Sequence, residues 1–196
     1  MIARPWLAQL SGLRLIIREH WVDIWIFGYG SLIWRPDFEF IRREKAAVSG
    51  WRRRFCQASP DHRGVPHAPG RVVTLVPETQ AWCEGVAYLL PADSRQEVLE
   101  ALDFRERNGY ERVHLTLRLD RGEEVAGLTY IADRNNPSYV DTSTLEETAT
   151  VIARAVGPSG TNRDYLHQLD NALLALDIHD DEIKSLTAAV ARVDKI

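Results

Sequence analysis

A glycine-rich turn follows the first strongly apolar segment of the chain, and its residue types suit the binding of an anion. The segment reads Ile26-Phe27-Gly28-Tyr29-Gly30-Ser31-Leu32-Ile33-Trp34. The β-branched and aromatic run over residues 24–27 predicts a buried strand. Gly28 and Gly30 permit backbone angles that place successive amides on one concave side, and Ser31 adds a hydroxyl. The pattern favours a small anionic ligand, while a plain turn between two elements would have the same composition.

A second polar segment, Asp103-Phe104-Arg105-Glu106-Arg107-Asn108-Gly109-Tyr110, lies where a predicted helix ends and a predicted strand begins. Junctions of this kind place polar side chains in clefts that have rigid structure on both sides. Glu106 could act there as a general acid and base, whereas an ordinary surface carboxylate would fit the same position. Residue type alone does not separate Glu106 from Asp103 or Glu111. In the same way, Asp61-His62-Arg63 could serve a site or form a structural turn.

Familiar nucleotide, serine-nucleophile and metal motifs are absent from the sequence. Ile33 occupies the place of the third glycine in G-x-G-x-x-G, and neither G-x-x-x-x-G-K-[ST] nor G-x-S-x-G occurs. Cys56 and Cys83 lack C-x-x-C spacing, which disfavours a disulfide scaffold or a zinc site. What remains is a carboxylate acid/base with an anion-binding loop, a combination that suits a reaction whose nucleophile the substrate supplies.

The charge of the chain is unevenly distributed. The whole chain of 196 residues has a formal charge of −4, yet residues 35–71 hold nine Arg or Lys against four Asp or Glu. Because Lys45 is the only lysine among these nine, the segment is unlike a surface that coats a nucleic-acid backbone. Arginine suits carboxylate recognition better, since its planar fork bonds a carboxylate at two points. The alternative is a solvated face whose arginines pair with acidic groups of the fold.

Hydrophobic periodicity predicts strands mostly in the first two thirds of the chain and helices in the last third. Strands are predicted at residues 24–29, 47–55, 72–76, 83–90, 112–119 and 124–131. Helices are predicted at residues 94–104, 145–156, 163–176 and 181–193, and Ser143 with Glu146 predicts a capping box at the second of them. The turn over residues 157–162 is predicted to lead into the third helix. This order predicts an α+β fold with a mostly antiparallel, barrel-like sheet and flanking helices.

The length and composition predict one compact domain preceded by a short extension. Within residues 1–23, Trp6, Leu10, Leu13 and Ile17 recur at helical spacing, which predicts an amphipathic helix that packs on the domain or a partner. Arginines and a proline interrupt this segment, so it is too polar for a membrane span and lacks a signal cleavage site. We therefore expect a cytoplasmic protein without a membrane partner.

Several short motifs occur in order between residue 24 and the C-terminal helices. They are the segment Phe27 to Trp34 given above, Arg53-Arg54-Phe55, Asp61-His62-Arg63-Gly64-Val65-Pro66, Pro69-Gly70-Arg71-Val72-Val73-Thr74-Leu75, Gly85-Val86-Ala87-Tyr88, Asp103-Phe104-Arg105-Glu106 with Gly109-Tyr110, and Gly157-Pro158-Ser159-Gly160. In these motifs the chain resembles the ChaC-like, glutathione-specific γ-glutamylcyclotransferases. The resemblance implies the fold of that family over residues 24–196 and leaves residues 1–23 outside the domain.

The resemblance also implies an activity and a set of site residues. A lyase of this family releases 5-oxoproline from γ-glutamyl compounds, chiefly glutathione, whose α-amine attacks its own γ-amide carbonyl to leave cysteinylglycine. Such a reaction requires no cofactor, metal or protein nucleophile. The resemblance implies Glu106 as the acid/base and a binding loop made of Ile26, Phe27, Gly28, Tyr29, Gly30, Ser31 and Leu32. Arg53 and Arg71 are further candidates for substrate carboxylates, and Tyr110 and Tyr165 for the pocket walls.

Two alternatives remain open from the sequence. The domain could be a binding or regulatory module without turnover, although Glu106 argues against this. It could instead act on other γ-glutamyl amino acids or amines, because Ala58-Ser59-Pro60 replaces the glycine-serine-threonine of the family pattern. The sequence predicts no nucleic-acid partner and leaves the protein partners unknown.

Overall fold

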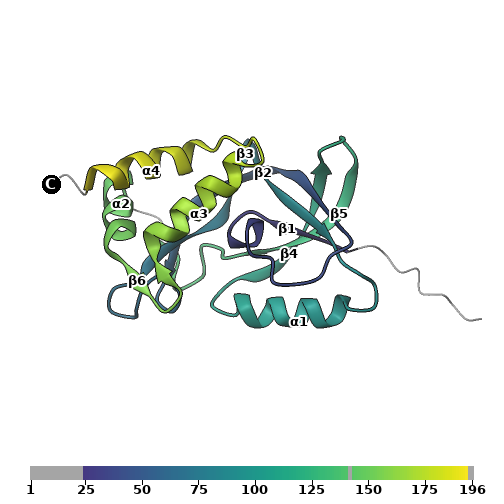
Figure 1. Ribbon diagram of the computed structural model, residues 1–196, viewed down its shortest axis with the longest axis horizontal. Helices are drawn as coiled ribbons and strands as arrows, with labels where there is room; N and C mark the ends of the chain where they lie inside the picture. The colour runs from purple at the N-terminus through teal and green to yellow at the C-terminus, as the bar shows by residue number, and fades with distance from the viewer. Residues whose placement is uncertain (1–23, 141–142, 194–196) are drawn as a thin grey trace, which may run out of the picture.

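A closed barrel of five strands forms the centre of the molecule (Figure 1). The computed structural model describes residues 24–140 and 143–193, so the helix predicted in residues 1–23 lies outside the described residues. The strands are β1 (Trp25–Gly28), β2 (Arg42–Ser59), β3 (Gly70–Leu89), β4 (Glu111–Leu119) and β5 (Glu124–Ile131), in the barrel order β1-β3-β2-β4-β5. All neighbours are antiparallel except β1 and β5, which pair in parallel and close the barrel. The prediction of an α+β fold with a mostly antiparallel, barrel-like sheet is confirmed.

Strands β2 and β3 are much longer than their sequence patterns indicated. The prediction of two separate strands at residues 72–76 and 83–90 is wrong, because β3 is continuous from Gly70 to Leu89. Residues 77–80 of β3 are exposed, so this part of the β2–β3 ribbon buries no face and shows no apolar alternation. Gln80 has a φ of 68°, and register shifts between Ser49 and Trp51 bend the facing strand.

Four α-helices of the described residues surround the barrel: α1 (Arg95–Glu106), α2 (Leu145–Arg154), α3 (Asn162–Leu174) and α4 (Asp181–Val193). Figure 1 shows α2, α3 and α4 grouped at one end of the molecule, while α1 lies apart from them near β4. The short strands β6 (Val156–Gly157) and β7 (Gly160–Thr161) form a hairpin immediately before α3. None of the described helices has both the length and the apolar character needed to cross a bilayer.

The capping box of α2 lies one residue later than predicted. Thr144, not Ser143, is the N-cap: its hydroxyl accepts a hydrogen bond from the Glu147 amide, and the Glu147 carboxylate accepts one from the Thr144 amide. Glu146 therefore takes no part in the box. Both pairs have the same spacing, and a one-residue difference in where the helix begins decides between them.

The core runs from the barrel interior into the helical layer. Phe27 and Tyr88 are fully buried inside the sheet, and Leu166 of α3, Ile152 of α2 and Leu186 of α4 are buried in the same apolar cluster. A 3₁₀ turn, η1 (Ser31–Ile33), follows β1 directly and packs against α3. The loop between β1 and η1 is thereby held between the barrel and the helices.

Candidate active site

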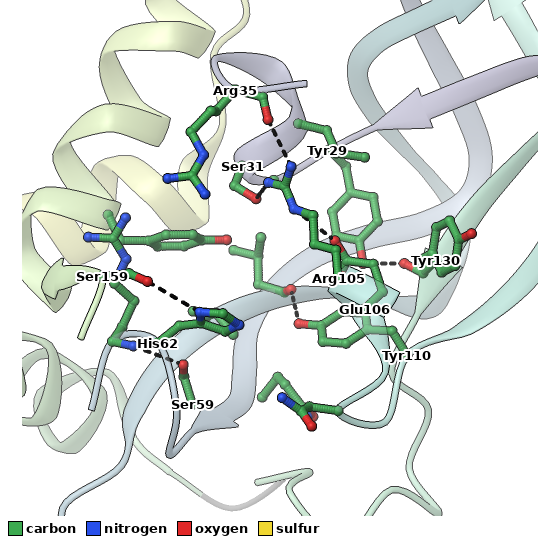
Figure 2. Close-up of a pocket in the computed structure, with 18 of the residues that line it drawn as sticks. Tyr29, Ser31, Arg35, Ser59, His62, Arg105, Glu106, Tyr110, Tyr130 and Ser159 are labelled. Atoms are coloured by element: carbon green, nitrogen blue, oxygen red, sulfur yellow. Dashed lines mark hydrogen bonds and ion pairs between the residues drawn. The ribbon is translucent and has the colours of Figure 1, made fainter. Parts of the chain in front are cut away.

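A cavity of about 170 Å³ opens where the β1–η1 loop, the end of β2, the end of α1 and the start of α3 meet. Figure 2 shows Tyr29, Ser31 and Glu106 on one part of its wall and His62 and Ser159 on another. The cavity gathers Phe27, Tyr29, Gly30, Ser31, Leu32, Glu106, Tyr110 and Tyr165 from among the residues singled out in the sequence. Four others, Ile26, Gly28, Arg53 and Arg71, do not line it.

Glu106 is the last residue of α1, and its carboxylate lies in a largely enclosed position. Its side chain is 18% exposed, and burial raises the pKa of the carboxyl above that of an ordinary glutamate. The Arg105 guanidinium, whose Nε lies 3.4 Å from Glu106 Oε1, opposes this rise in pKa. A carboxyl with a raised pKa exchanges protons more readily near neutral pH than a solvated one, which suits a general acid and base.

Arg105 joins the end of α1 to the loop after β1. Its Nη2 donates to Ser31 Oγ at 2.8 Å, and its Nη1 donates to the main-chain oxygen of Arg35 at 3.0 Å (Figure 2). The carboxylate of Glu106 and the glycine loop are therefore held together by one side chain rather than by packing alone.

Gly28 and Gly30 are required for space. Neither has a positive φ, although Gly30, with a φ of −125° and a ψ of −132°, lies outside the regular helix and strand regions. A Cβ on Gly30 would lie 2.9 Å from Val73 Cγ2 and 3.2 Å from the Tyr165 hydroxyl, and one on Gly28 would lie 2.8 Å from Leu32 Cβ. Gly30 keeps the cavity open, whereas Gly28 lets η1 fold back onto β1.

Buried tyrosines form much of the cavity wall. The Tyr29 hydroxyl donates to the main-chain oxygen of Tyr130 at 2.6 Å, and the Tyr110 hydroxyl donates to that of Val73 at 2.8 Å. Burial raises the pKa of Tyr29, Tyr110 and Tyr165, so all three phenols stay neutral. Tyr165 also packs edge-on against Trp34 and Phe55, with centroids 5.5 and 5.9 Å apart. The wall is rigid and largely apolar.

Arg53 lies behind the cavity. Its side chain is fully buried and forms an ion pair with Asp180, in the turn before α4. Nε donates to the main-chain oxygen of Tyr29 at 2.7 Å, and Nη2 donates to that of Glu84 at 2.5 Å. With its donors used in this way, Arg53 holds the β1–η1 loop through the Tyr29 carbonyl and does not line the cavity.

Arg71 is also held by groups of the fold. Its amide donates to Asn162 Oδ1 at 2.5 Å, and Asn162 Nδ2 donates back to the Arg71 carbonyl at 2.7 Å. Its Nη1 donates to the main-chain oxygen of Gly70 at 3.1 Å. This pairing ties the start of β3 to the first residue of α3.

The arginines that do line the cavity are Arg35, Arg63 and Arg105. The cationic segment over residues 35–71 contains two of them, but its charge pattern did not distinguish inward from outward side chains. Gln57, near the end of β2, was missed, because β2 holds many polar and charged residues and nothing in the sequence separates this one from the others. Among the described residues, no group of three or more His, Cys, Asp or Glu side chains is placed to hold a metal ion.

Comparison with known proteins gives consistent matches over most of the chain. A family model described as ChaC-like protein matches residues 24–193. "Gamma-glutamylcyclotransferase 2-3" of Arabidopsis thaliana is 38% identical over 178 residues, covering 87% of this chain and 89% of that protein. A "glutathione-specific gamma-glutamylcyclotransferase" of Escherichia coli is 36% identical over 172 residues, covering 87% of this chain and 74% of that protein.

A solved structure has the same fold. The crystal structure of a yeast γ-glutamylcyclotransferase specific to glutathione matches with a TM-score of 0.82 at 32% sequence identity. The match covers 87% of this chain and 96% of the yeast chain.

Proposed function

The chain belongs to the ChaC-like family, and we propose that it is a glutathione-specific γ-glutamylcyclotransferase, a lyase that converts glutathione into 5-oxoproline and cysteinylglycine. The observation that carries the proposal is the largely enclosed carboxylate of Glu106, tied through Arg105 to the loop that follows β1. The names of the Escherichia coli and yeast relatives supply the substrate.

Glu106 serves as the acid and base of the proposed reaction. Its carboxylate removes a proton from the α-ammonium of the γ-glutamyl group, and the freed amine attacks the γ-amide carbonyl. A C–N bond forms to close the five-membered ring, and the original amide C–N bond then breaks. The carboxyl returns its proton to the departing nitrogen, and the ring nitrogen gives its second proton to the same nitrogen. Cysteinylglycine therefore leaves as the ammonium form. The raised pKa of Glu106 supports both steps, since the same group must accept and donate a proton.

The loop over residues 29–32 is proposed to hold the γ-glutamyl group. The first amides of a helical turn have no partner within the helix, and η1 begins at Ser31, on the wall of the cavity. These donors suit the α-carboxylate, and Gly30 lets the substrate approach the backbone. Holding amine and carbonyl in contact replaces a bimolecular encounter, which contributes up to about 7–11 kcal/mol in well-aligned systems.

Ile26 and Gly28 support this loop without touching the substrate in our proposal, and Arg53 acts as a positioning residue through the Tyr29 carbonyl. Arg71 takes no part in binding. Tyr110 and Tyr165 serve as walls of the pocket, as expected. The reaction balances with substrate alone, so we propose no cofactor or metal.

The proposal includes a cytoplasmic location and no nucleic-acid or membrane partner. Cys56 and Cys83 are both buried and form no disulfide, which is typical of proteins in a reducing compartment. Several arginines of the cationic segment also have acidic partners within the fold, as Arg52 does with Glu78 and Arg54 with Glu182.

Mass spectrometry of products from purified protein tests the proposal. Wild type, Glu106→Gln and the matched variant Glu111→Gln, an exposed carboxylate at the start of β4, are each incubated with glutathione and with γ-glutamylalanine. We expect equimolar 5-oxoproline and cysteinylglycine from wild type and Glu111→Gln, and a rate about 10²- to 10⁴-fold lower from Glu106→Gln.

Other outcomes would change the assignment. Release of 5-oxoproline from γ-glutamylalanine alone would support the proposed reaction but assign it a different γ-glutamyl substrate. No product from either compound would favour a binding module. Unchanged activity in Glu106→Gln would exclude Glu106 as the acid/base.

A further inference from the structure

Arg63 carries a charge that the described residues leave without an ion-pair partner. The residue is 8% exposed and lines the cavity, yet within residues 24–140 and 143–193 no carboxylate lies within 4.0 Å of its guanidinium. The carboxylate of Asp164 raises the pKa of Arg63 through space but forms no ion pair with it. A buried cation without a counter-ion is costly in free energy, so an arginine in this state indicates an anion that binds there.

The Arg63 side chain is already fixed in position. The main-chain amide of Arg63 donates to Ser59 Oγ at 3.1 Å, and the side-chain Nη1 donates to the main-chain oxygen of Thr161 at 3.1 Å. The guanidinium also stacks over Tyr165, 5.4 Å from the ring centroid. One of its five N–H donors is used in this way, which leaves an ordered fork of donors at the cavity wall.

Gln57 presents a second unfilled polar group on the same wall. The residue is 1% exposed and lines the cavity, and its side-chain oxygen Oε1 is buried without a hydrogen-bond partner among the described residues. Leaving such an acceptor unpaired is unfavourable in free energy. Gln57 and Ser59 are two positions apart on β2, so the Gln57 side chain shares a face with the residue that holds Arg63.

These groups lie in the cavity of Glu106 but away from its carboxylate. Figure 2 shows His62 and Ser159 across the drawn cavity from Glu106, and the Ser159 amide donates to the His62 carbonyl at 2.9 Å. Arg63 follows His62 and lines the same cavity, and the carboxylate that affects its pKa is that of Asp164 rather than that of Glu106. An extended tripeptide, the proposed substrate, spans about 10 Å.

We propose that Arg63 binds the C-terminal carboxylate of the substrate and that Gln57 accepts a hydrogen bond from one of its peptide N–H groups. This inference rests on the proposed function, and it assigns the selectivity for glutathione to these two residues. A γ-glutamyl amine has neither a carboxylate for Arg63 nor a peptide N–H beyond the scissile amide.

Two substrates and a small set of variants test the proposal. Glutathione is compared with its C-terminal carboxamide, in which the glycine carboxylate is neutral, and kcat and KM for release of 5-oxoproline are measured for each. The variants are Arg63→Gln, Arg63→Lys and Gln57→Leu. Arg52→Gln is the matched control, because Arg52 lies on β2, the strand of Gln57, but is exposed and pairs with Glu78 outside the cavity.

We expect wild type and Arg52→Gln to favour glutathione about 10- to 100-fold in kcat/KM, mainly through KM. Arg63→Gln should raise KM for glutathione to that of the carboxamide and leave the carboxamide little changed. Gln57→Leu should raise KM for both compounds, since both retain the peptide N–H. If Arg63→Gln lowers the melting temperature strongly, Arg63→Lys replaces it and should retain part of the preference.

A preference of full size in Arg63→Gln, or no preference in wild type, would overturn the role of Arg63. An unchanged KM in Gln57→Leu would overturn the role of Gln57. In either case, release of 5-oxoproline from glutathione by wild type would still support the proposed function. Absence of product from both compounds in wild type would reject the proposed function and this inference with it.

Discussion

Arg105 donates from Nη2 to the Ser31 hydroxyl at 2.8 Å, and this bond joins the end of α1, which carries Glu106, to the loop after β1. The same guanidinium lies beside Glu106, where it opposes the effect of burial on the carboxyl pKa. The Arg105 side chain therefore both holds the loop after β1 against the end of α1 and counteracts the rise in the pKa of Glu106.

Replacing Arg105 should move the pH dependence of the reaction. In the proposed mechanism, activity requires the carboxylate form of Glu106 and is lost as the pH falls through the pKa of this group. Arg105→Gln removes the opposing charge, so the pKa of Glu106 rises further and the acid limb of the kcat profile moves to higher pH. The measurement is kcat against pH. Arg107→Gln is the control, because Arg107 stacks over exposed Phe104. An unshifted acid limb in Arg105→Gln would contradict the coupling.

Replacing Glu106 should stabilise the fold while it removes activity. A folded-state pKa above the unfolded value means that stability is fully present below the unfolded pKa and falls as the pH rises through the folded pKa. Glu106→Gln lacks this loss. We therefore expect the melting temperature of Glu106→Gln to exceed that of wild type at pH 7. In a domain of this size, each 1 kcal/mol of unfolding free energy corresponds to about 2–4 °C. The difference in melting temperature should vanish below pH about 4, where the carboxyl is protonated in both the folded and the unfolded state. A gap independent of pH would count against burial as its cause.

Arg53 should matter far more for stability than its neighbour in sequence. Arg53→Met leaves the Asp180 carboxylate and two main-chain oxygens without their buried partner, which we expect to cost about 3–5 kcal/mol of unfolding free energy. Arg54→Met breaks a half-exposed pair with Glu182 and should cost less than about 1 kcal/mol. Urea titration of both variants measures the difference. Similar costs would show that Arg53 is not the support of the loop.

A methyl group at Gly30 should block the cavity, and a second substitution should reopen it. Gly30→Ala places Cβ against Val73 Cγ2 and the Tyr165 hydroxyl, so we expect KM for glutathione to rise. Val73→Ala removes the closer of these contacts. The double variant should regain a large part of the lost affinity, whereas Val73→Ala alone should not lower KM. Failure of the double variant to recover would place the effect of Gly30→Ala elsewhere.

Chelators should leave the reaction unaffected, because the proposed proton transfers involve Glu106 and substrate groups only. Turnover of glutathione in the presence and absence of a strong chelator of divalent metals measures this directly. Activity that is lost on chelation and restored by a metal would refute the mechanism.

Regular elements with one buried face could be predicted from the sequence, and those without a buried face could not. The helix over residues 181–193 and the strand over residues 124–131 have the bounds that their apolar spacing indicates. The exposed part of β3 near Gln80 has no apolar period, so pattern reasoning divided one strand into two.

The arginines show why the site could be predicted only in part. Arg52, Arg53 and Arg54 form one charged run, and only the fold shows that the middle one points inward to meet Asp180, 127 residues later. Glu106 and the glycine loop were found because their family motif is local. Arg63 and Gln57 stand out only because the folded structure leaves their polar groups unpaired at the cavity wall, and no local sequence pattern indicates this.

The parallel pairing of β1 with β5 has a consequence for how the chain acquires its activity. Trp25 pairs with Gly127, and the Thr129 hydroxyl donates to the Phe27 carbonyl at 2.8 Å, so the seam joins segments about a hundred residues apart. Contacts of such long sequence separation form slowly, because a large loop must close first. A nascent chain on the ribosome therefore has to expose β1 as an unpaired edge until β5 has been synthesised. We expect catalytic competence to arise in a late, concerted step of folding.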